Sequence, residues 1–504
     1  MLIETHCHTR EHSSCSAVAA ADLAMRCFEE GLQGLVLTDH HHLWPAAELA
    51  ELRRRLAVPD FFLLAAGQEV TTGDFGDILV YGPRETIPRG ARLEDIRRRY
   101  PEAALVWAHP YRNGARPAPE RLLNPRLNGV EIFNSNHTFG ENHRGLMDWH
   151  RFKFTALGGT DTHAESYAAT YPTAFDHPVR TVAEIAAEIR HGRCRPFLRE
   201  IPHAGTSDTE VTEIGLGTDA QGRSRETIIV KDHGDPGAWT AAERTARIVD
   251  EIARCGFEGG TFRVPRPLGR DPESFTSIEE GIRGSSLFDR VAAGSREEAS
   301  HCLRLAAQWL ARLHNCRLQV TPAGAWLENE PVRLAHYLSA LEGMNHPHTR
   351  KAREIMIFVL ETERALYAAH PERLVQGHGD FHPKNILIGE DGDGPLFVAA
   401  IDFDSSFTMP PAFDVGTFLA QFRNQFFAMR EVHAKVTPDL FTNAYLHDAA
   451  TTEGFLREVQ LFKARTSLSI AYYLVKVGLG ESENLWRVLV EAEESLTRVA
   501  ATAS

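Results

Sequence analysis

The first 200 residues alternate short apolar runs with helix-like stretches, and this alternation constrains the fold more than any other feature of the chain. The runs "LQGLVLTDHH", "DILVYG" and "AALVWAHPY" each have the composition of a buried strand, and polar residues end two of them. Amphipathic patterns such as "SAVAAADLAMRCFEEG" lie between several of them. Strand–helix repetition of this kind is typical of α/β domains with a mainly parallel sheet or barrel. In such folds, sites are built where strands end at their carboxyl side.

The length and the charge of the chain narrow its class further. A chain of 504 residues is about three times the usual size of one domain, so we expect two or three domains. The net charge of −14 argues against a nucleic-acid-binding surface, which is normally basic. The sequence shows neither a long uncharged apolar run nor the pattern of a signal peptide. Seven scattered cysteines without a C-x-x-C pair favour a reduced compartment, so we expect a cytoplasmic protein without a membrane partner.

Histidine is concentrated in the first part of the chain, where more than half of the 25 histidines precede residue 204. His6 and His8 stand two positions apart in an extended segment, so their side chains share one face. Asp161 and His163 repeat this spacing. Mixed imidazole and carboxylate ligands suit zinc, manganese or iron, so the pattern predicts a site for two or three divalent transition metals. Further candidate ligands end separate apolar runs: Asp39, His40, Glu69 and His109.

The motifs "THCHT", "LTDHH", "GQEVTT", "WAHPY" and "GGTDTH" together resemble the PHP (polymerase and histidinol phosphatase) family over residues 1–203. The resemblance implies a distorted (β/α)7 barrel with a trinuclear metal site. Most members are phosphoesterases, whose metals lower the pKa of bound water and hold the oxygens of the phosphoester. Carried over by motif, the implied metal ligands are His6, His8, His40, Glu69, His109, Asp161 and His163.

Other positions in this segment leave alternatives open. His12 stands where some members have a ligand, and Asp39 is a further acidic candidate. Asn134 and His137 occupy a region where members vary, and the imidazole of His137 is the better metal ligand. Arg112, in "HPYR", either holds a substrate phosphate or forms a surface salt bridge.

The stretch "GHGDFHPKNILIG" has the form of a compact catalytic loop followed by a strand. Phosphoryl transfer from ATP needs one carboxylate near the acceptor hydroxyl, and an Asn and a second Asp that hold magnesium. Asp380, Asn385 and Asp402 match these roles in order and spacing. A protein kinase would instead show H-R-D-x-x-x-x-N and D-F-G.

This motif resembles that of the aminoglycoside phosphotransferase (APH) and choline kinase-like family, and the resemblance extends from about residue 210 to 490. The resemblance implies a two-lobed, protein-kinase-like α+β domain that uses Mg-ATP and phosphorylates the hydroxyl of a small molecule. It implies that Lys231 grips the ATP phosphates and that Glu243 is its ion-pair partner, with Glu251 as the rival candidate.

The domain expected from this resemblance covers residues 208–504, with an N-lobe of about 208–276 and a C-lobe of about 280–504. Its weakest part is "EIGLGTDAQGRSRE", where Gly215 and Gly217 form either a phosphate loop or an ordinary hairpin turn.

We therefore expect a bifunctional enzyme with a metal-dependent phosphoester hydrolase before an ATP-dependent small-molecule kinase. Two alternatives stay open: a nucleic-acid end-processing nuclease with a kinase half, and a kinase regulated by a ligand-sensing barrel. The acidic total and the lack of basic–aromatic tracts argue against the nuclease. The retained H-x-H pair, Asp380 and Asp402 argue against the sensor.

Overall fold

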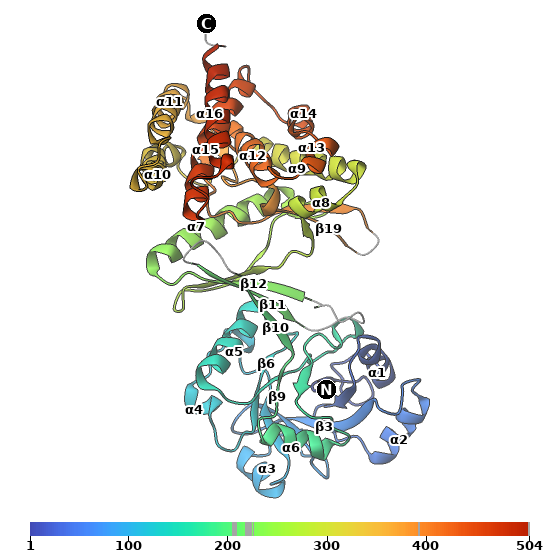
Figure 1. Ribbon diagram of the computed structural model, residues 1–504. Coiled ribbons are helices and arrows are strands. Elements are labelled where there is room, and N and C mark those ends of the chain that lie inside the picture. The colour runs from blue at the N-terminus through green and yellow to red at the C-terminus, as the bar shows by residue number, and fades with distance from the viewer. Residues whose placement is uncertain (204–208, 217–223, 225, 392–393, 502–504) are drawn as a thin grey trace. The chain divides into compact units, whose positions relative to one another are not determined.

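The computed structural model describes residues 1–203, 209–216, 224, 226–391 and 394–501 (Figure 1). The chain forms two compact units. The first consists of Met1–Gly234 with Leu268–Gly281, and the second of Asp235–Pro267 with Ile282–Ser504. The strands expected in the kinase N-lobe therefore fall largely within the first unit. The predicted boundary at residues 203–208 separates the two segments that resemble known families. The division into compact units does not test it, so it stays a prediction.

A nine-stranded sheet forms the body of the first unit, in the order β7-β6-β5-β4-β3-β2-β1-β8-β9. Its last strand, β9, lies against β7 at the opposite edge, so the sheet is nearly closed into a barrel. The strands are β1 (Leu2–Glu4), β2 (Gly34–Leu37), β3 (Leu63–Thr71), β4 (Asp77–Tyr81), β5 (Ala104–Trp107), β6 (Gly129–Phe133), β7 (Ala156–Gly158), β8 (Thr173–Phe175) and β9 (Cys194–Pro196). The predicted α/β class is confirmed for this unit.

The barrel differs from the regular strand–helix alternation that the resemblance implies. Strand β4 runs antiparallel to both β3 and β5, and β8 and β9 are also antiparallel to their neighbours. The connection between β3 and β4 is the short segment 72–76, whose turn is closed by Thr72 Oγ1 and the Gly76 carbonyl, 2.7 Å apart. A parallel crossover needs a dozen or more residues, so this link permits only a hairpin. The sheet holds nine strands, in contrast to the (β/α)7 barrel that the resemblance implies.

Helices cover the outside of this sheet (Figure 1). Helix α5 begins with a capping box, in which Thr138 and Glu141 each satisfy the other's backbone nitrogen. Every residue of β2, β6 and β7 is buried, as expected for parallel strands covered on both faces. The helices are α1 (Ala20–Glu29), α2 (Ala46–Arg55), α3 (Leu93–Arg99), α4 (Pro119–Leu122), α5 (Phe139–Phe152) and α6 (Val182–Arg190).

A second, five-stranded sheet in the order β10-β11-β12-β16-β15 packs against the barrel. Ile214, Ile228 and Ile278 of this sheet share one buried core with Val130 and Ile132 of β6. Burial of apolar side chains across this contact is what joins the sheet to the barrel. Its strands are β10 (Leu198–His203), β11 (Glu210–Leu216), β12 (Glu226–Asp232), β15 (Pro267–Asp271) and β16 (Thr276–Glu280).

The second unit is mainly helical around two small sheets, β13-β14-β20-β19-β17 and β18-β21. The face predicted for α9 is buried at Ala299, Leu303 and Leu310, which confirms the helical pattern read from the sequence. The helices are α7 (Pro236–Ile252), α8 (Leu287–Ala293), α9 (Arg296–Asn315), α10 (Ala323–Gly343), α11 (Thr349–Tyr367), α12 (Pro411–Gln425), α13 (Arg430–Lys435), α14 (Pro438–Asp448), α15 (Phe455–Lys476) and α16 (Glu483–Ala501). The strands are β13 (Glu258–Gly259), β14 (Phe262–Arg263), β17 (Ser285–Ser286), β18 (Val375–Gln376), β19 (Ile386–Glu390), β20 (Leu396–Ala400) and β21 (Thr408–Met409). Among the described residues, the structure contains no helix with the length and apolar character needed to span a bilayer.

Candidate functional site

Four buried side chains converge at one end of the barrel. His6 and His8 follow β1, Glu69 belongs to β3, and Asp161 follows β7. The Nε2 atoms of the two histidines are 3.2 Å apart. Glu69 Oε2 lies 3.3 Å from His6 Nε2 and 3.1 Å from His8 Nε2. Asp161 Oδ1 lies 3.5 and 3.1 Å from the same two nitrogens. The H-x-H pair and Asp161 therefore meet, as the strand spacing predicts.

These distances fit a metal ion. Ligand atoms that each bind a tetrahedral metal at about 2.1 Å are about 3.4 Å from one another. The five measured separations within the cluster, from 3.1 to 3.5 Å, are close to that value. The donor set of two imidazoles and two carboxylates also suits zinc, manganese or iron.

The same carboxylate of Glu69 reaches two further histidines. His109 Nε2 lies 2.9 Å from Glu69 Oε1, and His40 Nδ1 lies 3.1 Å from Oε2 without hydrogen-bond geometry. Burial would raise the pKa of Glu69, but the hydrogen bonds of His109, His6 and His8 outweigh it and hold this pKa well below its usual range. Glu69 is therefore an ionised carboxylate with both oxygens directed at imidazoles.

Asp161 and His109 have backbones that L-residues rarely adopt. Their φ angles are +49° and +32°, in or near the left-handed region. Such strain persists where surrounding structure enforces it, and it is common at functional sites. Burial would raise the pKa of Asp161, but the charge of His6 and the hydrogen bond of His8 hold it well below its usual range. The carboxylate of Asp161 is thus ionised.

His163 lies at the edge of this cluster. Its Nδ1 is 2.9 Å from the Asp161 carbonyl oxygen, so Nδ1 carries the proton and Nε2 keeps its lone pair. Ligand atoms of His8, His40 and His163 come within 4.8 Å of one another, and those of Glu69, Asp77 and His109 form another such group. The sequence did not single out Asp77, an acid that begins β4 and lies opposite Thr71, two residues after Glu69 in β3. All seven implied ligands therefore lie in one connected region.

Glu131 is a second residue that the sequence reading missed. It is fully buried in β6, and its Oε1 is 2.8 Å from His6 Nδ1. A carboxylate only accepts, so Nδ1 donates and His6 presents Nε2 to the cluster. Glu131 Oε2 also accepts from the backbone nitrogen of His109 at 2.8 Å. The only local signal was an acid inside the apolar run "NGVEIFN".

The variable positions occupy different places. Asn134 donates through Nδ2 to Glu131 and to Asp161, at 3.1 and 3.2 Å. His137 donates from Nδ1 to Asn142 at 2.9 Å, and its buried Nε2 has no hydrogen-bond partner among the described residues. His137 is outside the groups of converging ligand atoms found in the described part of the chain.

Arg112, Asp39 and His12 also differ in their surroundings. The guanidinium of Arg112 contacts Asp161 Oδ2 at the rim of the cluster. Asp39 is buried, and its carboxylate accepts hydrogen bonds from Thr9, Ser13 and Trp44. His12 lies beside Glu48, in a separate group of candidate ligands.

The second candidate site is in the second unit, at the loop between β18 and β19. Asn385 Nδ2 donates to the carbonyl oxygen of Asp380 at 3.1 Å and to its Oδ2 at 3.3 Å. The backbone nitrogen of Ile401 donates to the Asn385 carbonyl at 2.9 Å, which places Asp402 next to Asn385. Asp402 is exposed and has a φ of +67°, a strained conformation at a predicted functional position. The three predicted residues thus come from one small region.

Histidines support the loop that carries Asp380. His382 Nδ1 accepts from the backbone nitrogens of Lys384 and Asn385, so its proton is on Nε2, 3.5 Å from Asp380 Oδ2. Burial would raise the pKa of Asp380, but the charge and hydrogen bond of His382 outweigh it, and the pKa is lowered. His378 Nε2 donates to the Ile401 carbonyl at 3.0 Å, which joins the loop to the end of β20.

Asp414 holds the same loop through hydrogen bonds to its backbone. Its buried carboxylate accepts from the backbone nitrogens of His378 and Gly379, at 2.8 and 2.7 Å, and lies 3.0 Å from His314 Nε2. Gly379 has a φ of +86°, and a Cβ there would lie 1.9 Å from the Ser405 carbonyl oxygen, so only glycine fits. Asp414 therefore positions the loop that carries Asp380.

The predicted ATP-binding residues are in separate surroundings. Lys231, in β12, pairs with Glu279 of β16 at 2.9 Å, and the sequence reading missed this acid. Glu243 is exposed on α7. Gly215 permits close packing, because a Cβ there would lie 2.1 Å from Ser224 Oγ, whereas Gly217 lies outside the described residues.

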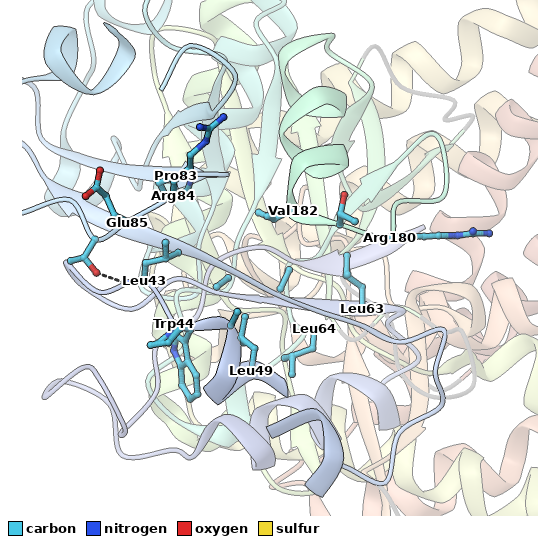
Figure 2. A pocket seen from close by; sticks show the side chains of 16 residues that line it. Leu43, Trp44, Leu49, Leu63, Leu64, Pro83, Arg84, Glu85, Arg180 and Val182 are labelled. Atoms are coloured by element: carbon cyan, nitrogen blue, oxygen red, sulfur yellow. Dashed lines mark hydrogen bonds between the residues drawn. The ribbon is translucent and has the colours of Figure 1, made fainter. Parts of the chain in front are cut away.

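A cavity of about 510 Å³ opens in the first unit, away from the histidine cluster. Figure 2 shows the apolar side chains of Leu43, Leu49 and Leu64 around it, with the charged groups of Arg180 and Glu85 at its margin. Its lining contains none of the candidate metal ligands.

A family model matches the part of the chain that carries the second site. Residues 210–458 match the phosphotransferase enzyme family. Similar solved structures include ethanolamine kinase of Plasmodium vivax, with 16% identity and a TM-score of 0.41 over 59% of this chain and 81% of that chain. Choline kinase of Cryptosporidium parvum has 11% identity and a TM-score of 0.41 over 61% and 91%. An ADP-bound aminoglycoside phosphotransferase has 15% identity and a TM-score of 0.37 over 60% and 92%.

One curated relative is an uncharacterized protein of Methanocaldococcus jannaschii. It is 26% identical over 114 residues, which is 22% of this chain. The match spans 64% of the length of that relative.

Proposed function

We propose that the domain over residues 210–458, which matches the phosphotransferase enzyme family, transfers the γ-phosphoryl group of ATP to a hydroxyl of a small molecule. Asp380 accepts the proton of the acceptor hydroxyl. The acceptor oxygen bonds to the γ-phosphorus while the bond to the β,γ-bridging oxygen breaks, and ADP leaves with that electron pair. The observation that carries this role is the contact of Asp380 with both Asn385 and His382.

The surroundings of Asp380 support this assignment. The Nε2–H of His382 and the amide nitrogen of Asn385 both face its carboxylate, which keeps it ionised and oriented. The amide nitrogen of Asn385 is used in this way, so its oxygen is the atom left to bind a cation together with the Asp402 carboxylate. Magnesium ions, when bound there, would neutralise charge on the phosphates.

The test of this half is ATP turnover by the full chain against a panel of amino alcohols, amino sugars and sugars, with ADP release as the readout. We expect at least one acceptor to stimulate ADP release, and Asp380→Asn to lower kcat by about 10²- to 10⁴-fold. Glu372→Gln, an exposed acid near the start of the same segment, is the matched control and should keep full activity. Equal kcat values for the wild type and Asp380→Asn would refute the role of Asp380.

We further propose that the barrel is a metal-dependent phosphoester hydrolase of the PHP type. The carrying observation is the convergence of His6, His8, Glu69 and Asp161, in which five of the separations between ligand atoms are 3.1–3.5 Å. Metals bound by this set and by the neighbouring imidazoles would supply an activated water and charge neutralisation for the phosphoester.

The chain's own residues have defined roles in that reaction. Glu131 orients His6, and the backbone bond from His109 to Glu131 fixes a second histidine. Arg112, partly exposed beside Asp161 at the rim, would bind the anionic group of the substrate. Both domains thus act on phosphate groups. They avoid a futile cycle of phosphorylation and hydrolysis only if they act on different substrates or at different positions of one substrate.

The hydrolase is tested with p-nitrophenyl phosphate and bis(p-nitrophenyl) phosphate in the presence of manganese or zinc. We expect release of nitrophenol that is lost in a His6→Ala/His8→Ala variant and kept in Asp380→Asn. Arg112→Ala should raise KM more than it lowers kcat, because the arginine binds substrate. Hydrolysis that survives in the double histidine variant would show that the barrel cluster is not its source.

A further inference from the structure

A second cluster of metal-ligating side chains lies outside the site described above. His12 Nε2 is 2.9 Å from Glu48 Oε2, and the rings of His12 and His42 stack with centroids 3.7 Å apart. One ligand atom from each of His12, His42 and Glu48 lies within 4.8 Å of the other two. None of these three residues belongs to the groups formed around Glu69 and Asp161.

The distances and the burial of this cluster fit a cation. Two ligands at about 2.1 Å from one ion are about 3.0–3.4 Å apart, close to the 2.9 Å between His12 and Glu48. His42 Nε2 is buried and has no hydrogen-bond partner among the described residues. A buried, unpartnered nitrogen costs free energy, and a metal ion would remove that cost.

The loops that carry the cluster are held in place independently of any metal. Asp39 Oδ1 accepts from Thr9 N at 2.7 Å and from Ser13 Oγ at 2.6 Å, which fixes the loop around His12. Asp39 Oδ2 accepts from Trp44 Nε1 at 2.7 Å, which fixes the segment that follows His42. The edge of the Trp44 ring also packs against His12. The buried Asp39 thus fixes the backbone segments on either side of the two histidines, and the stacked imidazole rings, 17° from parallel, have to turn for both lone pairs to point at one ion.

We propose that His12, His42 and Glu48 form a separate site for one divalent transition metal, with zinc as the best-suited ion. Two imidazoles and one carboxylate are a common zinc ligand set, and three protein ligands leave one position for water or an oxygen of a ligand. The site is accessible, because the side chains of His12 and Glu48 are 21% and 49% exposed. It is therefore an exchangeable site, in contrast to the fully buried pair of His6 and His8.

The test is the zinc content of the full chain after loading and desalting, measured for the wild type, His42→Ala and Glu48→Gln. We expect each variant to contain about one zinc fewer per chain than the wild type. His177→Ala is the matched control, because His177 also pairs with a glutamate at 2.9 Å but belongs to none of the groups of converging ligand atoms found in the described part of the chain. Unchanged zinc content in both variants would overturn the proposal.

Two further measurements separate this site from the inner cluster. His6→Ala/His8→Ala should keep the zinc that His42→Ala loses, so the two sites can fail independently. Anomalous diffraction from zinc-loaded crystals should show a peak between His12, His42 and Glu48 that is absent in His42→Ala. Zinc density at the inner cluster alone would contradict the outer site.

Discussion

Oδ1 of Asp161 lies 3.1 Å from Nε2 of His8, where the segment after β7 meets the segment after β1. The backbones of the two segments are joined there as well, because Asp161 N donates to the His6 carbonyl at 2.7 Å and His8 N donates to the Thr162 carbonyl at 3.1 Å. A metal at this point would therefore hold together the segments after β1 and β7.

Metal removal should destabilise the first unit. An ion that binds only the folded state stabilises it by about 2.7–4.1 kcal/mol per site when the free metal is about 100 to 1,000 times Kd. Urea unfolding followed with and without a chelator measures this difference. Identical unfolding curves would show that the closure between His8 and Asp161 does not depend on metal.

Glu131→Gln should weaken metal binding without unfolding the barrel. The substitution removes the charge that orients His6, and loss of such a supporting contact typically costs about 10- to 100-fold in metal affinity. Competition with a coloured chelator measures the change. Glu184→Gln, an exposed acid on α6, is the control, and an affinity equal to that of this control would contradict the role of Glu131.

Asp414→Ala should destabilise the second unit strongly. The change leaves the backbone nitrogens of His378 and Gly379 and the Nε2 of His314 without their acceptor, and each buried donor left unsatisfied costs about 1–3 kcal/mol. Denaturant unfolding measures this loss, with the exposed Asp439→Ala as control. A loss no larger than that of the control would show that the catalytic loop does not need Asp414.

Because of His143, the stability of the first unit should decrease as the pH falls below 6.5. Burial lowers the pKa of this helix α5 residue from 6.5 to about 4, and its Nε2 has no hydrogen-bond partner among the described residues. The unfolded chain therefore takes up a proton at a higher pH than the folded chain does. Its contribution is complete above pH 6.5 and is lost as the pH falls towards 4.

The size of this effect follows from the shift. Between pH 7.5 and pH 5 the wild type should lose about 2 kcal/mol that a His143→Phe variant keeps. Unfolding free energies of both proteins at the two pH values give the difference directly. An equal loss in both would assign the acid sensitivity to other groups.

Local periodicity could predict part of the fold and of the barrel site. The two-residue spacing of His6 and His8, and the apolar face of α9, depend only on local geometry, and both hold in the structure. Glu131 and Glu279 could not be found in this way. Each acts on a partner far away in the sequence, His6 and Lys231, which only the pairing of strands brings near.

The antiparallel β4 was missed for a related reason. The run "DILVYG" has the same composition as a parallel strand, and only the short link at 72–76 distinguishes the two. His12 was a candidate ligand of the central cluster. In the structure it lies beside Glu48, in a separate group.

The most direct measurement is the transition-metal content of the purified protein beside a His6→Ala/His8→Ala variant, with His177→Ala as control. If the buried cluster holds metal, the wild type and the control should carry two or more equivalents per chain, and the double variant should carry fewer. Equal metal content in all three proteins, or none in the wild type after manganese or zinc is supplied, would contradict the metal-dependent barrel.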